Sequence, residues 1–188
     1  MKLLEERILQ EGIVLGEDIL KVDGFINHQV DIALMEELGR DMAEHFQGQG
    51  ITKVFTIESS GIAPALFTAK YLKVPMVILK KQVSKNLQTE VWQTEVASYT
   101  KNVSYDLTLA KNYISDSDHI LIVDDFLANG EAATGAVRLI RKAHATIAGV
   151  GVLIEKVFQP GRKKLESQGI SVYAQASIRS FENGQVIF

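Results

Sequence analysis

Residues 120–133 read ILIVDDFLANGEAA, and this stretch decides the fold. Its first four residues are apolar, which is typical of a short buried strand. A turn-like Ala128-Asn129-Gly130 follows, and the apolar side chains beyond it recur at helical spacing as far as Ala143. The stretch therefore predicts a strand, a loop and a helix in succession. Two carboxylates, Asp124 and Asp125, follow the apolar run, and parallel α/β sheets bind their ligands at the carboxyl ends of strands.

The same alternation of strand and helix extends along most of the chain. Asp31 is placed to cap an amphipathic helix that carries Met35, Leu38, Met42 and Phe46 on one face. The predicted strands are 51–57, 74–79, 120–123, 147–154 and 170–178, and the other predicted helices are 63–71, the one that follows Gly130, and a short one from Pro160. Buried strands that alternate with amphipathic helices predict an α/β domain with a mainly parallel central sheet flanked by helices.

Length and composition limit the class of protein. The chain has 188 residues, no cysteine and a net charge of −3, so we expect a single domain spanning residues 1–188. Without cysteine there are no disulfides, thiolate zinc sites or cysteine nucleophiles. The acidic balance argues against nonspecific nucleic-acid binding. The N-terminus does not resemble a signal peptide, and the longest apolar stretch, 147–154, is too short to cross a bilayer. We therefore expect a cytoplasmic protein that binds neither membranes nor nucleic acid.

One segment, residues 83–110, departs from the regular pattern. It shows two irregularly alternating runs separated by Lys101-Asn102, which predicts a polar hairpin or a long mobile arm. A solvent-exposed edge hairpin with no role in function explains the same pattern.

The acid pair and the loop after it suggest a ligand class. Carboxylates accept hydrogen bonds from hydroxyl groups, and the amides of a helix N-terminus bind anions. Together they suit a phosphate ester of a polyhydroxyl compound, although an acidic strand end before a helix cap also arises for structural reasons alone. The chain contains no P-loop motif, and Gly48 and Gly50 precede a strand instead of following one, so neither common nucleotide fingerprint applies.

The segment from Val123 to Gly130 resembles the signature of the type I phosphoribosyltransferases, which bind 5-phosphoribosyl 1-diphosphate (PRPP). The resemblance extends over nearly the whole chain, including residues 19–29, 56–64 and 154–162, and within the family it is nearest to bacterial members that act on xanthine. It implies the family fold, with a hood over the base largely from residues 1–30. It also implies a flexible hairpin lid at about 83–110, where Ser98-Tyr99 resembles the Ser-Tyr pair of the family's loop.

The resemblance also assigns roles in donor binding. Asp124 and Asp125 would be the catalytic pair that holds the ribose hydroxyls. Lys80 is a further candidate for the diphosphate. The remaining donor-binding residues that it implies are Ala128, Asn129, Gly130, Glu131 and Ala132 around the 5-phosphate, and Ser59, Ser60 and Lys81 around the diphosphate.

The loop of residues 128–132 departs from the commoner family sequence. It reads Ala-Asn-Gly-Glu-Ala where that sequence is Ala-Thr-Gly-Gly-Thr, so it lacks two hydroxyls and gains an acid. Because a carboxylate that points at a phosphate would repel it, we expect Glu131 to face away and to favour the helix N-terminus.

For the base, the resemblance implies contacts from Leu20, Asn27, Lys156 and Phe158. Lys156 follows the apolar strand 147–154 and should emerge at the edge of the site, with Phe158 as a candidate wall. Asn27 offers an amide donor, which suits the 2-oxo group of xanthine, whereas the 2-amino group of guanine would require an acceptor.

The implied activity is transfer of the phosphoribosyl group from PRPP to N9 of xanthine in purine salvage. The implied cofactor is Mg²⁺, held mainly through the diphosphate and waters, with no protein ligand assigned, and the implied assembly is a homodimer. Two alternatives remain open: an enzyme for guanine and hypoxanthine or for adenine, and a non-catalytic PRPP-sensing regulator that contacts nucleic acid.

Overall fold

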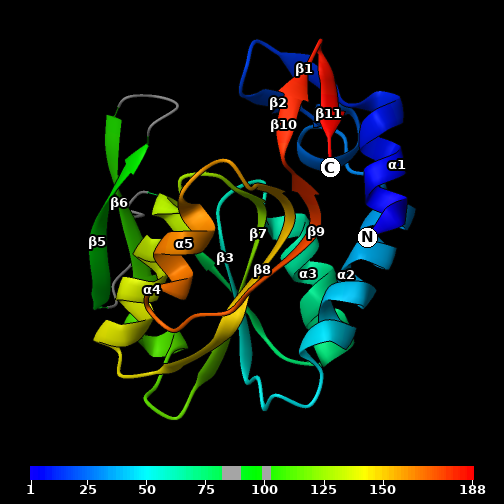
Figure 1. Cartoon of the computed structure of the whole chain (residues 1–188). Helices are drawn as coiled ribbons and strands as arrows, with labels where there is room; N and C mark the ends of the chain where they lie inside the picture. The colour runs from blue at the N-terminus through cyan, green and yellow to red at the C-terminus, as the bar shows by residue number, and fades with distance from the viewer. Residues whose placement is uncertain (82–89, 99–102) are drawn as a thin grey trace.

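The computed structural model describes residues 1–81, 90–98 and 103–188. Its centre is a five-stranded parallel sheet with the strand order β4-β3-β7-β8-β9 (Figure 1). The strands of this sheet are β3 (Lys53–Ile57), β4 (Met76–Leu79), β7 (His119–Leu127), β8 (Thr146–Lys156) and β9 (Val172–Ile178). The prediction of an α/β domain with a mainly parallel sheet is confirmed, and all five predicted strands are present.

Helices cover both faces of this sheet. Figure 1 shows α2 and α3 on one side and α4 and α5 on the other. Their bounds are α2 (Ile32–Phe46), α3 (Ile62–Leu72), α4 (Glu131–Lys142) and α5 (Gly161–Glu166). Alternate side chains of β7 enter the two resulting cores: Leu121 and Val123 pack on the α2 side, and Ile120 and Ile122 pack on the α4 side. Strand β7 is therefore buried on both faces, as its continuous apolar run predicts.

The cap predicted for α2 is present. The Asp31 carboxylate accepts a hydrogen bond from the Leu34 amide at 3.1 Å, which satisfies one of the free donors of the first turn. The side chains of Met35, Leu38 and Met42 are fully buried, so the helical spacing in the sequence does mark the face of α2 that meets the sheet.

A second layer of short elements lies beside the sheet. The N-terminal part comprises α1 (Lys2–Glu11), the antiparallel pair β1 (Ile13–Leu15) and β2 (Ile19–Lys21), and a π-helical turn (Asp23–Asn27). The C-terminal hairpin comprises β10 (Ser180–Glu182) and β11 (Gln185–Ile187), and neither strand is among those predicted from the sequence. Helix α1 contacts both β9 and β11, so the two ends of the chain meet here (Figure 1).

The predicted hairpin is present as β5 (Val91–Ser98) and β6 (Val103–Ala110), followed by a 3₁₀ turn (Lys111–Tyr113). One of its faces is not exposed, because Val96, Leu107 and Leu109 are buried in the same core as α4. Backbone hydrogen bonds of 3.0 and 2.8 Å also join Lys80 at the end of β4 to Thr108. The interpretation as a solvent-exposed edge hairpin is therefore wrong for this face. The rest of the predicted lid, including Tyr99, lies outside the described residues.

Within the described part of the chain, no helix is long and apolar enough to span a bilayer.

Candidate active site

Asp124 and Asp125 lie near the carboxyl end of the sheet, but inside a strand. The sequence predicts that the strand ends at Val123, whereas β7 continues to Leu127. The reason is that β8 also extends further, to Lys156, and its pairing with β7 continues up to Leu127 and Glu155. The amide of Asp125 donates to Asp124 Oδ1 at 3.0 Å, which joins the two acids directly. Their positions are thus fixed by the sheet and not by a loop.

The environment of the two acids disfavours their charged forms. Burial raises the pKa of Asp124 well above its ordinary value, and the negative charge of Asp125 raises it further. Burial also raises the pKa of Asp125, although hydrogen bonds from its neighbours oppose this. The positive charge of Lys81 favours the ionised form of both groups. A pair of acids that share a partly desolvated cavity is typical of a functional site.

The loop of residues 128–132, called the phosphate loop below, joins β7 to α4. Gly130 has a φ of +78° and stands immediately before Glu131, the first residue of α4. The loop lines a cavity of about 180 Å³ together with Lys81, Tyr105 and Asp124. Its amides stand at a helix N-terminus, where the backbone favours anions. The structure therefore places this predicted anion site next to the acid pair.

Helix α5 packs directly against the phosphate loop. The Gly161 amide donates to the Ala128 carbonyl at 3.0 Å. A Cβ added at Gly130 would lie 2.8 Å from Gly161 Cα, and one added at Gly161 would lie 2.3 Å from the Ala128 oxygen. Glycine is therefore required on both sides of this contact.

Glu131 does have a partner outside the loop. Its carboxylate forms an ion pair with the Lys164 ammonium of α5. The prediction that Glu131 faces away from a bound phosphate is not tested by this contact, but the contact shows which side chain holds the acid.

The segment Glu58–Gly61 joins β3 to α3 and approaches the acid pair from the other side. A cavity of about 130 Å³ is lined by Ser59, Ser60, Lys81 and both acids, among other residues. A Cβ on Gly61 would meet Asp124 Oδ1 at 2.5 Å, so a side chain at this position would prevent the approach. Six predicted donor-binding residues from separate parts of the sequence thus line one cavity, namely Ser59, Ser60, Lys81, Asp124, Asp125 and Ala132.

The two lysines at the end of β4 have different environments. Lys80 forms an ion pair of 3.3 Å with Glu58. The backbone amide of Lys81 donates to the other Glu58 oxygen at 2.7 Å, and its ammonium lies 5.4 Å from the centre of the Tyr105 ring. Lys81 lines both small cavities, so it is better placed than Lys80 to meet a diphosphate.

Of the four residues predicted to contact the base, Asn27 and Lys156 have side chains that form polar contacts close to the acid-pair segment of β7. Asn27 Nδ2 donates to Asp125 Oδ2 at 3.2 Å, which brings the N-terminal segment to the acid pair. The Lys156 ammonium donates to the Asp18 carbonyl at 2.5 Å and lies 5.8 Å from the centre of the Phe126 ring. Burial lowers the pKa of Lys156, and the charge of Asp18 opposes this shift.

Leu20 and Phe158 stand in other surroundings. The side chain of Leu20 is buried in the core that contains α1 and α2. The ring of Phe158 is 46% exposed and packs edge to face on Phe181, with ring centres 5.8 Å apart. Their contact with a base stays a prediction.

Sequence reasoning missed two side chains of the site, Tyr105 and Phe126. Tyr105 lines the 180 Å³ cavity beside the phosphate loop, and burial together with the charge of Asp124 raises the pKa of Tyr105. Phe126 directly follows Asp125 in the signature stretch, and this position in the sequence could have indicated that it belongs to the site. Nothing in the sequence placed Tyr105 near Asp124, because this proximity comes from packing of the hairpin against α4.

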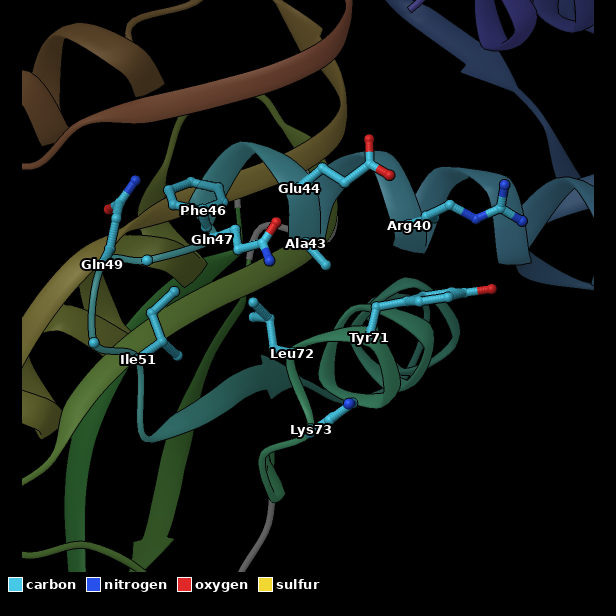
Figure 2. Close-up of a pocket in the computed structure, with 12 residues that line it drawn as sticks. Arg40, Ala43, Glu44, Phe46, Gln47, Gln49, Ile51, Tyr71, Leu72 and Lys73 are labelled. Atoms are coloured by element: carbon cyan, nitrogen blue, oxygen red, sulfur yellow. The ribbon is translucent and has the colours of Figure 1, made fainter.

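The largest of the described cavities lies elsewhere. It measures about 500 Å³ and is formed where α2 and α3 end, with Arg40, Phe46, Tyr71 and Lys73 among its walls (Figure 2). Both helices end near the amino-terminal edge of the sheet, opposite the acid pair. The candidate site at the acid pair therefore does not coincide with the largest of these cavities.

Comparison with known proteins agrees with this geometry. The family model described as "Phosphoribosyl transferase domain" matches residues 29–181. The xanthine phosphoribosyltransferase of Agathobacter rectalis is 58% identical over 100% of this chain and 98% of its own length. The xanthine phosphoribosyltransferase of Clostridium acetobutylicum is 55% identical over the full length of both proteins.

Solved structures show the same fold at low identity. The adenine phosphoribosyltransferase of Rhodothermus marinus has a TM-score of 0.77 at 24% identity and covers 95% of this chain and 100% of its own. The Trypanosoma brucei adenine phosphoribosyltransferase, in complex with AMP, pyrophosphate and ribose-5-phosphate, has a TM-score of 0.77 at 16% identity and covers 93% and 79%. The matched model, the full-length relatives and the shared fold together show that the chain belongs to the phosphoribosyltransferase family.

Proposed function

We propose that this protein transfers the 5-phosphoribosyl group of PRPP to N9 of xanthine, giving xanthosine 5′-monophosphate and pyrophosphate in purine salvage. The observation that carries the proposal is the position of Asp124, which lines both the phosphate-loop cavity and the Ser59-Ser60 cavity. A donor with a phosphate at one end of a ribose and a diphosphate at the other fits this order of sites. The full-length similarity to xanthine phosphoribosyltransferases supports the choice of base.

Each part of PRPP then has a binding partner of suitable chemistry. The amides of residues 128–132 hold the 5-phosphate, and Ser59, Ser60 and Lys81 hold the diphosphate. Asp124 and Asp125 lie between these groups and accept hydrogen bonds from the ribose hydroxyls. Negative charge on this pair, which the neighbouring Lys81 ammonium favours, also stabilises the positive charge that develops on the sugar when its leaving group departs.

Mg²⁺ fits this site as a substrate-bound ion. In residues 1–81, 90–98 and 103–188, no three or more His, Cys, Asp or Glu side chains are grouped to hold a metal. Mg²⁺ characteristically keeps several waters and binds through one or two carboxylates plus substrate phosphates. The candidates are Asp124 and Asp125, acting directly or through water. When bound, the ion supplies positive charge to the diphosphate oxygens.

The reaction forms the bond between N9 of the base and C1 of the ribose and breaks the bond between C1 and the diphosphate oxygen. The base releases one ring proton to the solvent, N9 supplies the electron pair of the new bond, and the diphosphate leaves with the electron pair of the broken bond. The protein's task is to hold the two reactants in line and to exclude water, which would otherwise capture the sugar. We propose that the segment around β5 and β6 contributes to this exclusion as a lid.

For the base, we propose that the Asn27 amide and the Lys156 ammonium read the oxo groups of xanthine. The two side chains come from opposite ends of the chain, and Phe126 lies beside Lys156. In the structure, the Asn27 amide donates to Asp125 and the Lys156 ammonium donates to the Asp18 carbonyl. We also propose a cytoplasmic homodimer, as the family resemblance implies.

The choice of base is tested by turnover with xanthine, guanine, hypoxanthine and adenine at saturating PRPP and Mg²⁺. We expect kcat/KM for xanthine to exceed that for each of the others by at least about tenfold, since an unpaired polar group in the site costs about 1–3 kcal/mol. A preference for guanine or adenine would contradict the proposed substrate. No turnover with any base, combined with measurable binding of PRPP, would favour the alternative of a PRPP-sensing regulator.

The contribution of Asn27 gives a more specific prediction. We expect Asn27→Ala to raise the KM for xanthine by about tenfold to a hundredfold and to change the KM for PRPP much less, because the lost amide faces the base. Initial rates at fixed saturating co-substrate measure both constants. The matched control is Gln29→Ala, which removes an exposed amide two residues away. Equal losses for xanthine and PRPP would show that Asn27 acts through its contact with Asp125 instead.

A further inference from the structure

The ion pair between Glu131 and Lys164 joins the phosphate loop to α5. The Glu131 side chain is 24% exposed and the Lys164 side chain is 37% exposed, so solvent screens the attraction between their charges only in part. Charges in such a position interact more strongly than charges on an open surface. This pair therefore affects the electrostatics of the adjoining cavity.

The position of Glu131 presents a problem for phosphate binding. It lies in the loop whose amides form the proposed 5-phosphate site, and it is one of the residues that line the 180 Å³ cavity. A carboxylate stabilises the start of α4, since acids favour a helix N-terminus. The same negative charge repels a phosphate dianion bound to the loop. The loop thus needs a cation that neutralises the acid without occupying the phosphate site.

Lys164 is held in the position that this role requires. Its helix begins at Gly161, whose amide bonds to the Ala128 carbonyl of the phosphate loop. The next residue, Arg162, donates to both oxygens of the buried Glu155 carboxylate, at 2.7 and 2.6 Å. The short helix is thus tied to the end of β8 as well as to the loop, so the Lys164 side chain starts from a fixed backbone.

We propose that Lys164 is a positioning residue that sets the affinity for the phosphorylated donor through Glu131. Its ammonium keeps the Glu131 carboxylate directed toward α5 and cancels the charge that would repel the 5-phosphate. This inference rests on the proposed function, because it requires the phosphate loop to bind a phosphate ester. It makes the phosphate loop dependent on a side chain that itself touches neither PRPP nor the base.

The test measures binding of ribose 5-phosphate by calorimetry, which requires neither a base nor turnover. We expect Lys164→Met to raise the Kd about threefold to fivefold, because the Glu131 charge is then no longer cancelled and interactions of partly exposed charges are worth up to about a factor of five. The KM for PRPP should rise in parallel while kcat stays within about twofold. Adding Glu131→Gln to the Lys164→Met protein should restore most of the affinity, because the repelling charge is then gone.

The matched control is Lys163→Met, which removes the same charge from the same helix at an exposed position. We expect less than a twofold change in its Kd, and thermal melting shows whether every variant is folded. If Lys164→Met binds as tightly as the wild type, or if Glu131→Gln fails to rescue it, the charge-pair inference is overturned while the proposed function stands. If the wild-type protein binds neither ribose 5-phosphate nor PRPP, both are overturned.

Discussion

Replacing Asp125 with alanine is expected to reduce kcat/KM about 10²–10³-fold, with the protein still folded. The ribose would lose its hydrogen bonds to this carboxylate, and the charge that develops on the sugar would lose a stabilising interaction. Removing one such polar group from an active site typically lowers the rate by about 10²–10³-fold. Steady-state rates with xanthine and PRPP measure the loss, and circular dichroism checks the fold.

The same acid pair should lower the stability of the folded protein at neutral pH. Because the pKa of Asp124 is raised by burial and by the charge of Asp125, the folded state binds a proton more tightly than the unfolded chain does. The free energy of unfolding therefore falls as the pH rises from about 3.8, the ordinary carboxyl value, to the raised pKa. Asp124→Asn removes this cost. We expect a higher melting temperature at pH 7 together with a large loss of activity.

Asp118 provides a control, because its pKa is shifted in the opposite direction from that of Asp124. Burial raises its pKa, but hydrogen bonds from Lys53, Thr52 and the Ser115 amide outweigh this effect and leave the pKa lowered. Asp118→Asn should therefore reduce stability at pH 7 and leave kcat/KM nearly unchanged, because Asp118 lies immediately before β7, at the other end of that strand from the acid pair. A stability loss in Asp124→Asn similar to that in Asp118→Asn would show that Asp124 is a structural acid.

The second large effect is expected for Gly130→Ala. An alanine at a φ of +78° is strained by about 1–2 kcal/mol, and its Cβ would lie 2.8 Å from Gly161 Cα. The loop and α5 must then separate, which moves the amides away from the phosphate. Since a displacement of about 1 Å can cost about a hundredfold in rate, we expect a loss of that size in kcat/KM, mostly through a higher KM for PRPP.

Gly48 allows the strain to be separated from the contact. Its φ is also +78°, but an added Cβ there would meet no atom within 4 Å, and it lies near the distant 500 Å³ cavity. Gly48→Ala should therefore lose some stability from backbone strain while keeping its KM for PRPP. If both variants lose stability equally and Gly130→Ala keeps its affinity for PRPP, the phosphate loop does not need its close approach to α5.

Local sequence patterns predicted the sheet and its covering helices correctly. Strand β8 contains a long apolar run, β3 is rich in β-branched and aromatic residues, and α2 combines a capping aspartate with a regular apolar face, so local composition and periodicity identify them. The terminal hairpin strands were missed, because β10 and β11 have three residues each and three residues cannot establish a period. Their place beside α1 depends on contacts between the two ends of the chain.

For the site, the sequence by itself supplied the candidate residues: adjacent carboxylates after an apolar run, and a glycine directly before the next helix. Only the tertiary structure decided how these groups meet. Parallel pairing of β3, β7 and β8 brings Ser59, Asp124 and Lys156 to one edge of the sheet, and packing of the hairpin adds Tyr105. The ion pair between Glu131 and Lys164 likewise depends on the tertiary structure. Charges that lie far apart in the sequence acquire partners only when packing fixes the distance between them.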